Sequence, residues 1–206
     1  MFDSKSGSAA VLRISALVLF AVLIAFPAAA QRSANKFGPP AQAPRSGDCL
    51  ACVAPATPLT AEQATQLQFM REEEKLARDV YRALYAKWNL RIFDRISDSE
   101  QRHFDTIGRQ LTLNGIADPT LDKAEGEFTN TELQALYTEL IAKGSLSVKD
   151  ALEVGVLVEE TDIEDLEKIL ETETHATLKR IYNSLLNGSL NHLDSFEGYV
   201  EIYSAQ

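Results

Sequence analysis

The sequence predicts an all-α fold for residues 59–206, and three observations support this. Apolar residues recur at helical spacing throughout the segment, it contains a single proline (Pro119), and no stretch alternates apolar and polar residues over the length of a strand. The chain has 206 residues, of which 45% are hydrophobic, so a domain of this size can bury a substantial core. Four long helices and one short helix account for the pattern.

The first helix is expected over residues 60–87, where a capping box begins at Thr60. Apolar residues gather on one side of this helix at about 100° per residue. Of three consecutive acids, Glu73 falls near the centre of the apolar stripe, Glu74 falls on its edge, and Glu72 is expected to point outward. A carboxylate among core positions costs free energy unless it is paired or bound to a cation.

The second helix is expected over residues 93–113. Glu100 and His103 lie one turn apart on its apolar face, so a carboxylate and an imidazole point together toward the core. A short helix over residues 130–143 follows, and its inward positions are all apolar. We expect this short helix to cross from one helix pair to the next.

The fourth helix is expected over residues 147–170. Glu159 and Asp162 both lie within roughly 30–40° of the centre of its apolar stripe, whereas the neighbouring acids face away. Two carboxylates three residues apart are therefore expected on a buried face.

The fifth helix is expected over residues 174–199, with a break considered at Gly188. His192 lies near the middle of its apolar side. Tyr81 and Tyr182 also lie near inner faces, where they either hydrogen-bond metal ligands or, as the simpler interpretation, are core residues with satisfied hydroxyl groups.

Acids and imidazoles thus fall on the inner faces of four separate long helices. An isolated inward Glu can pair with an Arg, but the recurrence on matched faces favours a metal site, since carboxylate-bridged di-metal centres in four-helix bundles use this ligand set. Oxygen donors with one or two imidazoles suit iron or manganese better than copper or structural zinc. We therefore expect two iron ions, with manganese as the alternative metal. The candidate ligands are Glu73, Glu100, His103, Glu159, Asp162 and His192.

Four segments occur in a familiar order, namely REEEKLARDVY (71–81), SEQRH (99–103), VEETDI (158–163) and GSLNHL (188–193). They resemble the ferritin-like family known as domain of unknown function 2202, and the match extends over about residues 59–203. The resemblance implies a ferritin-like four-helix bundle with a dinuclear metal-binding motif. It implies no particular reaction.

The family pattern points to the same six candidate ligands. One position departs from the broader ferritin-like pattern, in which the last helix supplies Glu-x-x-His, because here Ser189 stands where that Glu is expected. The sequence leaves three interpretations open, in which Asp162 compensates from the neighbouring helix, the site is asymmetric, or it holds one metal.

The first functional hypothesis is a di-iron oxidoreductase that acts with O₂ or peroxide. The alternatives are a non-catalytic metal-binding or stress protein and a metal-free helical interaction module in which arginines such as Arg78, Arg102 and Arg180 neutralise the inward acids. Metal ions are the expected partners. Nucleic acid is not, because 30 Asp and Glu outnumber 20 Lys and Arg and leave a net charge of −10.

Residues 1–30 have the pattern of a signal peptide, with a basic start, a short apolar run and small residues before the expected cleavage point. We therefore expect an exported protein, periplasmic or secreted, without stable membrane insertion after cleavage. Residues 31–58 are rich in Pro and Ala and predict a flexible tether. Cys49 and Cys52 within it indicate either a local disulfide or thiol pair, or a redox or metal pair. The oligomeric state stays open, with a dimer among the alternatives.

Overall fold

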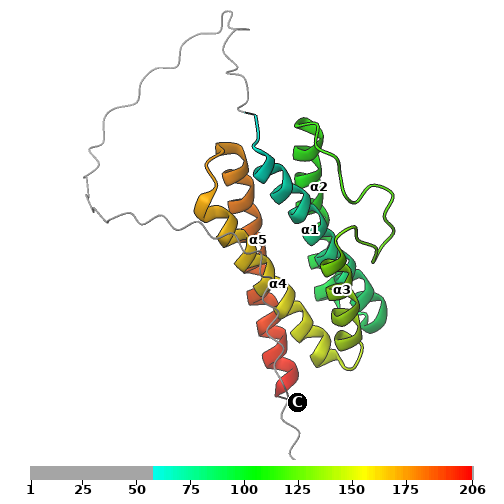
Figure 1. Cartoon of the computed structure of the whole chain (residues 1–206). Coiled ribbons are helices and arrows are strands. Elements are labelled where there is room, and N and C mark those ends of the chain that lie inside the picture. Colours follow the sequence, from blue (N-terminus) through cyan, green and yellow to red (C-terminus); the bar gives the residue numbers. More distant parts are fainter. Residues whose placement is uncertain (1–57, 206) are drawn as a thin grey trace, which may run out of the picture. The chain divides into compact units, whose positions relative to one another are not determined.

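The computed structural model describes residues 58–205, and over this part of the chain it contains five α-helices and no strand. This confirms the all-α prediction. None of these helices combines the length and the apolar character needed to cross a lipid bilayer. The signal peptide, the cysteine pair and the tether up to residue 57 lie outside the described residues and stay predictions. The helices are α1 (Ala61–Trp88), α2 (Arg91–Leu113), α3 (Thr131–Gly144), α4 (Val148–Thr172) and α5 (Ala176–Ser204) (Figure 1).

Side-chain caps determine where most helices begin. Thr60 forms the predicted capping box of α1, and Asn130 and Ser147 accept hydrogen bonds from the first-turn N–H groups of α3 and α4. The imidazole of His175 does the same for α5. Helix α1 ends at Asn89, which adopts a left-handed conformation with φ of 52°.

Helix α5 passes through Gly188 without interruption, so the break considered there is wrong. Glycine in a helix interior costs about 1 kcal/mol relative to alanine, which lowers stability locally but does not end a helix whose flanking turns are packed. Leu185 on one side of Gly188 and Ser189 and Phe196 on the other are buried.

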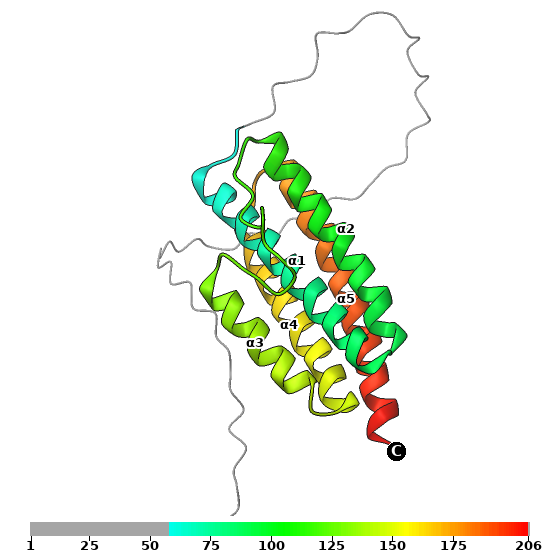
Figure 2. The ribbon, with the colours of Figure 1, turned by 90° about the vertical axis from the view of Figure 1, so that its right-hand side faces the viewer.

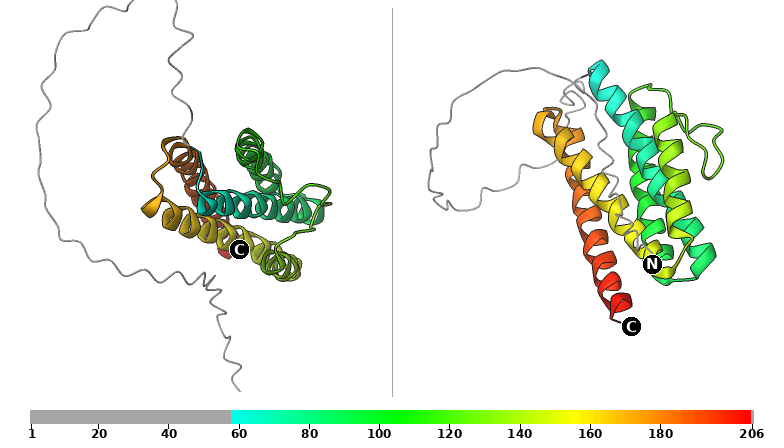
Figure 3. Two further views of the ribbon diagram at one scale, coloured as in Figure 1. Left: turned by 45° about the horizontal axis from the view of Figure 1, so that its top comes forward. Right: turned by 60° about the horizontal axis from the view of Figure 1, so that its bottom comes forward.

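The long helices form two closely packed pairs, α1 with α2 and α4 with α5 (Figure 3). Contacts between the pairs run from α1 to α4 and from α2 to α5, and α2 and α5 lie side by side in Figure 2. Helix α3 packs on the outside, against α1 and α4 (Figure 2).

Two apolar clusters fill the interior, and the candidate site lies between them. The first apolar cluster includes Tyr81, Leu84, Phe93, Leu152 and Phe196. The second apolar cluster includes Leu67, Met70, Ile107, Leu166, Leu178 and Tyr182. Each of the four long helices passes from one cluster to the other, and the inward acids and histidines fall at the crossing point. Helices α1 and α5 cross in one direction and α2 and α4 in the other, so a single polar layer receives side chains from all four.

Glu72 points outward from the apolar stripe of α1, as predicted, but it is not exposed to solvent. Its side chain is buried, and its carboxylate accepts hydrogen bonds from the backbone N–H groups of Thr129 and Asn130. The outer face of α1 is covered by the connection between α2 and α3, residues 114–130, which a periodicity argument applied to one helix does not include.

Two further charged groups of α1 hold the same connection. Arg71 forms an ion pair with Asp118 at 2.9 Å. Lys75 donates to Asp79 at 2.5 Å and to the carbonyl of Ala124 at 2.7 Å. Because these cations bind acids of the outer face and of the connection, they do not neutralise the acids of the inner face.

Candidate metal centre

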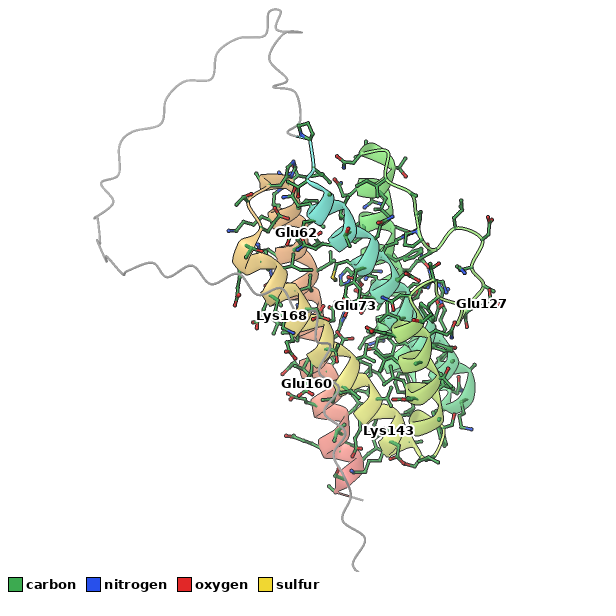
Figure 4. The ribbon with its side chains drawn as sticks, in the orientation of Figure 1. Glu62, Glu73, Glu127, Lys143, Glu160 and Lys168 are labelled. Atoms are coloured by element: carbon green, nitrogen blue, oxygen red, sulfur yellow. The ribbon has the colours of Figure 1, made fainter. Side chains whose placement is uncertain are left out.

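The polar layer between the two apolar clusters gathers buried carboxylates and two half-buried imidazoles. Helix α1 contributes Glu73 and Glu74, and Glu73 lies on the side of α1 that faces α4 (Figure 4). The other members of the layer are Glu100 and His103 from α2, Glu159 and Asp162 from α4, and Ser189 and His192 from α5. All the carboxylates are buried, and the two imidazole side chains are 14% and 12% exposed.

One group of ligand atoms comes from α1 and α2. His103 Nδ1 lies 2.8 Å from Glu100 Oε2 and 3.4 Å from Glu74 Oε2. One ligand atom from each of these three residues lies within 4.8 Å of the other two, which is a spacing that a single metal ion can span.

A second group joins α2, α4 and α5. His192 Nδ1 lies 2.7 Å from Glu100 Oε1 and 3.5 Å from Glu159 Oε2. These three residues also offer ligand atoms within 4.8 Å of one another. Glu100 therefore belongs to both groups, with one carboxylate oxygen facing each imidazole, and the two imidazole rings are 5.8 Å apart between centroids.

The donor atoms of this layer fit a cation better than they fit one another. Although each Nδ1 lies within 2.8 Å of an oxygen of Glu100, neither Nδ1 atom makes a hydrogen bond of normal geometry. Buried atoms without a hydrogen-bond partner are rare, and each costs free energy unless something else binds it. The atoms in this position are Glu73 Oε2, Glu74 Oε1, Glu100 Oε1, His103 Nδ1, Asp162 Oδ1 and His192 Nδ1.

Tyr81 supports the layer from the side of the first apolar cluster. Its hydroxyl group donates a 2.6 Å hydrogen bond to Glu159 Oε1, so the hydroxyl is satisfied as predicted and also contacts a candidate ligand. The ring of Tyr81 packs against Phe93 and Phe196, with centroids 6.2 and 5.2 Å away. Tyr182 differs, because its buried hydroxyl has no hydrogen-bond partner among the described residues, and the prediction of a satisfied hydroxyl is wrong there.

Comparison with known proteins assigns the chain to a family. The family described as an uncharacterized protein domain (DUF2202) matches residues 63–206. This chain belongs to the DUF2202 family. It is 42% identical over 151 residues to the uncharacterized protein MJ0754 of Methanocaldococcus jannaschii, an overlap that covers 73% of this chain and 82% of that protein.

A solved relative of this DUF2202 protein has a similar fold. The crystal structure of the hypothetical protein MJ0754 from Methanococcus jannaschii DSM 2661 matches with a TM-score of 0.71 at 42% identity, and the match covers 73% of this chain and 86% of the other. Membership of the DUF2202 family, expected from the four sequence segments, is thereby confirmed.

The electrostatics of the DUF2202 site centre on Glu100. Burial opposes ionisation of its carboxyl group, but the neighbouring imidazoles of His103 and His192 outweigh burial and lower its pKa to about 2. Burial by itself would lower the pKa of each imidazole, whereas the surrounding carboxylates raise it to about 11 for His103 and about 9 for His192. Without a cation, the imidazoles thus favour ionisation of Glu100, and Glu100 favours protonation of both imidazoles.

The other carboxyl groups of the DUF2202 site favour their neutral form when no cation is present. Burial, followed by repulsion from Asp162, raises the pKa values of Glu73 and Glu74 well above the ordinary value. Burial also raises the pKa of Glu159 to about 8 and that of Asp162 to about 7. Burial thus favours protonated carboxyl groups in a site where a metal ion would favour ionised ones.

The structure brings together four of the six predicted ligands, namely Glu100, His103, Glu159 and His192. Glu73 and Asp162 are buried in the same polar layer but lie outside both three-residue groups, and Ser189 donates a hydrogen bond to Asp162. That any of the six binds a metal stays a prediction.

Glu74 completes the first group and was missed as a ligand. Its position on the edge of the apolar stripe predicts a less inward side chain than that of Glu73 at the centre. Helix α1 is turned so that both acids are buried, which a stripe centred on apolar side chains does not reveal.

The described residues provide no Lys or Arg that pairs with the acids of the polar layer. Of the arginines considered for this role, Arg78 binds Asp79 and Gln101 instead. Arg102 and Arg180 are exposed. Pairing with arginine therefore does not account for the inward acids.

Proposed function

We propose that this protein binds two divalent cations between α1, α2, α4 and α5 of a ferritin-like four-helix bundle and acts as a di-iron oxidoreductase with O₂ or peroxide. Iron is the proposed metal and manganese the alternative. The observation that carries the proposal is the position of Glu100, which offers one buried oxygen to each of two half-sites. Glu74 and His103 complete one half-site, and Glu159 and His192 complete the other.

Charge supports cations over any internal pairing. Five buried carboxyl groups and two imidazoles share the polar layer without an arginine or lysine partner among the described residues. Without a cation, these acids can stay buried only by holding protons or by pairing with the two imidazoles, and both cost free energy. Two divalent cations would neutralise most of the carboxylates and would also bind the nitrogen and oxygen atoms that lack hydrogen bonds.

The donor set favours iron or manganese. Carboxylate oxygens with one imidazole for each metal suit first-row ions that accept mixed oxygen and nitrogen ligands. When bound in such a site, iron supplies redox chemistry with O₂ or peroxide that amino-acid side chains lack.

The residues around the site have supporting tasks under this proposal. Tyr81 holds Glu159 in place through its hydrogen bond. Loss of such a contact to a metal ligand commonly weakens metal affinity. The apolar clusters on both sides exclude bulk water. The partly exposed edges of His103 and His192 leave a small oxidant an approach to the polar layer.

Cobalt titration and elemental analysis test metal binding. We expect the full chain, purified without chelator, to contain iron or manganese, and the apoprotein to bind two Co(II) ions with visible ligand-field absorption. At a hundred times the Kd, bound metal should stabilise the fold by about 2.7 kcal/mol for each site. The double substitution Glu100→Gln with His103→Leu should abolish uptake. Glu160→Gln removes an exposed carboxylate of α4 beside Glu159 and is the matched control, with uptake unchanged.

The three functional hypotheses give different results in these assays. A wild-type protein that ignores Fe(II), Mn(II) and Co(II), together with a double variant that is more stable, would refute the metal proposal and favour the interaction module. Metal binding without O₂ consumption or peroxide loss in the presence of Fe(II) would refute the oxidoreductase and favour a protein that only stores or senses metal.

A further inference from the structure

Helix α4 carries a line of three acids that leads out of the polar layer. Glu159, Asp162 and Asp165 are spaced by three residues, so each lies beside the next around the helix, with a rise of about 4.5 Å at each step. Glu159 and Asp162 are buried, whereas the side chain of Asp165 is 15% exposed. The line therefore connects the candidate ligand Glu159 to a carboxylate that reaches water.

Glu73 of α1 faces this line from the opposite helix. After burial, the charges of Asp162 and Asp165 are the strongest influences that raise the pKa of Glu73, so its carboxyl group lies near both of these acids. The charge of Asp162 also raises the pKa of Glu74, which belongs to the first half-site. The carboxyl groups of the two helices are thus close neighbours from the edge of the bundle to the ligand groups.

Two oxygens along this line are buried and have no hydrogen-bond partner. They are Glu73 Oε2 and Asp162 Oδ1, and both residues are more than nine-tenths buried. Ser189 donates to the other oxygen of Asp162, which leaves Oδ1 as its unused acceptor. Neither Glu73 nor Asp162 forms an ion pair with a Lys or Arg in the part of the chain that the structure describes. Such oxygens are available to a cation that passes through.

We propose that Asp165, Glu73 and Asp162 form the loading route through which a hydrated divalent cation reaches the two half-sites. A bare cation crossing an apolar shell would lose its hydration energy without compensation. Carboxylates at successive steps replace the water ligands one at a time, and an acidic opening raises the local cation concentration and the association rate. The inference rests on the proposed function, and it assigns Glu73 and Asp162 to transit positions beside the half-sites.

Stopped-flow binding of Co(II) to the full-length apoprotein tests the route. Asp165→Asn should slow both association and dissociation about tenfold, because a route changes rates in both directions. The equilibrium affinity should stay within about twofold, because the ligands of the half-sites are intact. Glu73→Gln is the second variant and should slow loading in the same way.

Glu164→Gln is the matched control. Glu164 is the exposed neighbour of Asp165, and both contact Lys168, at 2.8 and 3.4 Å. Its substitution removes the same charge and the same lysine contact without touching the line of inward acids, so the loading rate should equal that of the wild type.

The outcomes separate the route from the metal site. If Asp165→Asn loads cobalt as fast as Glu164→Gln does, the route is refuted. If Asp165→Asn lowers the affinity by the same factor as the association rate, Asp165 is a ligand and the route is again refuted. If the wild-type protein binds no cobalt at all, the proposed function is refuted and the route is refuted with it.

Discussion

Gly188 lies in the middle of α5, where an added methyl group would collide with the His103 imidazole. A Cβ atom at this position would lie 2.6 Å from Cε1 and 2.7 Å from Nε2 of that ring. Nonbonded carbon atoms prefer about 3.5 Å or more, so in Gly188→Ala the ring must retreat by roughly 0.8 Å. Metal ligands tolerate deviations of only about 0.2 Å. We expect cation binding at the half-site of Glu74, Glu100 and His103 to weaken about 10- to 100-fold.

Gly198 offers a matched control in the same helix, because a Cβ atom there would meet nothing within 4 Å. Gly198→Ala should raise the free energy of unfolding by about 0.5–1 kcal/mol through helix propensity alone. Gly188→Ala has the same propensity gain but also forces a side chain out of a packed position, which typically costs 1–3 kcal/mol. The two variants should therefore differ by about 1–3 kcal/mol in the metal-free protein.

Two measurements check this reasoning. Urea unfolding of the apoproteins compares the two stabilities, and Co(II) titration compares the affinities of the two half-sites. If Gly188→Ala is as stable as Gly198→Ala and binds two cobalt ions with wild-type affinity, the close approach of His103 to α5 has no functional consequence and the argument is refuted.

Three further predictions concern a hydrogen bond, an ion pair and the protons of the candidate metal site. Tyr81→Phe removes the donor to Glu159, so the free energy of unfolding should fall by about 1–3 kcal/mol in urea unfolding of the apoprotein; an unchanged value would contradict this. Burial opposes ionisation of Asp118, but Arg71 and the hydrogen bonds from Thr120 together outweigh burial and lower the pKa. The ionised Asp118 therefore stabilises the fold above the unfolded-state pKa, and this stabilisation is lost as pH falls through the folded-state pKa. The Tm difference between wild type and Asp118→Asn should accordingly be present at pH 7 and disappear in strong acid. Cation binding at pH 7 should release protons from the two imidazoles and from Glu159, so the calorimetric enthalpy should depend on the buffer and the affinity should fall from pH 8 to pH 6.

Local sequence patterns were sufficient for the helices. The capping residues Thr60, Asn130 and Ser147 place the starts of three helices, because a cap is a contact within one turn of chain. Local patterns did not predict two details, because both depend on tertiary packing, namely the burial of Glu72 and the continuity of α5 through Gly188. Glu72 is buried by a connection more than forty residues away in the chain, and Gly188 continues a helix because packing on its flanks outweighs its low propensity.

The candidate site was predictable only in part. Helical periodicity identified Glu100, His103, Glu159 and His192 as inward residues, since the direction of a side chain around its own helix depends on about 100° per residue and on nothing else. Periodicity could not show that Glu100 would face both imidazoles or that Glu74 would complete a half-site.

The sequence by itself determined which helices form and which polar side chains turn inward. The tertiary structure decided which of those side chains meet, because that depends on the rotation and axial offset of each helix against its neighbours. Those offsets are set by how the two apolar clusters pack above and below the polar layer, and packing joins residues that are far apart in the chain.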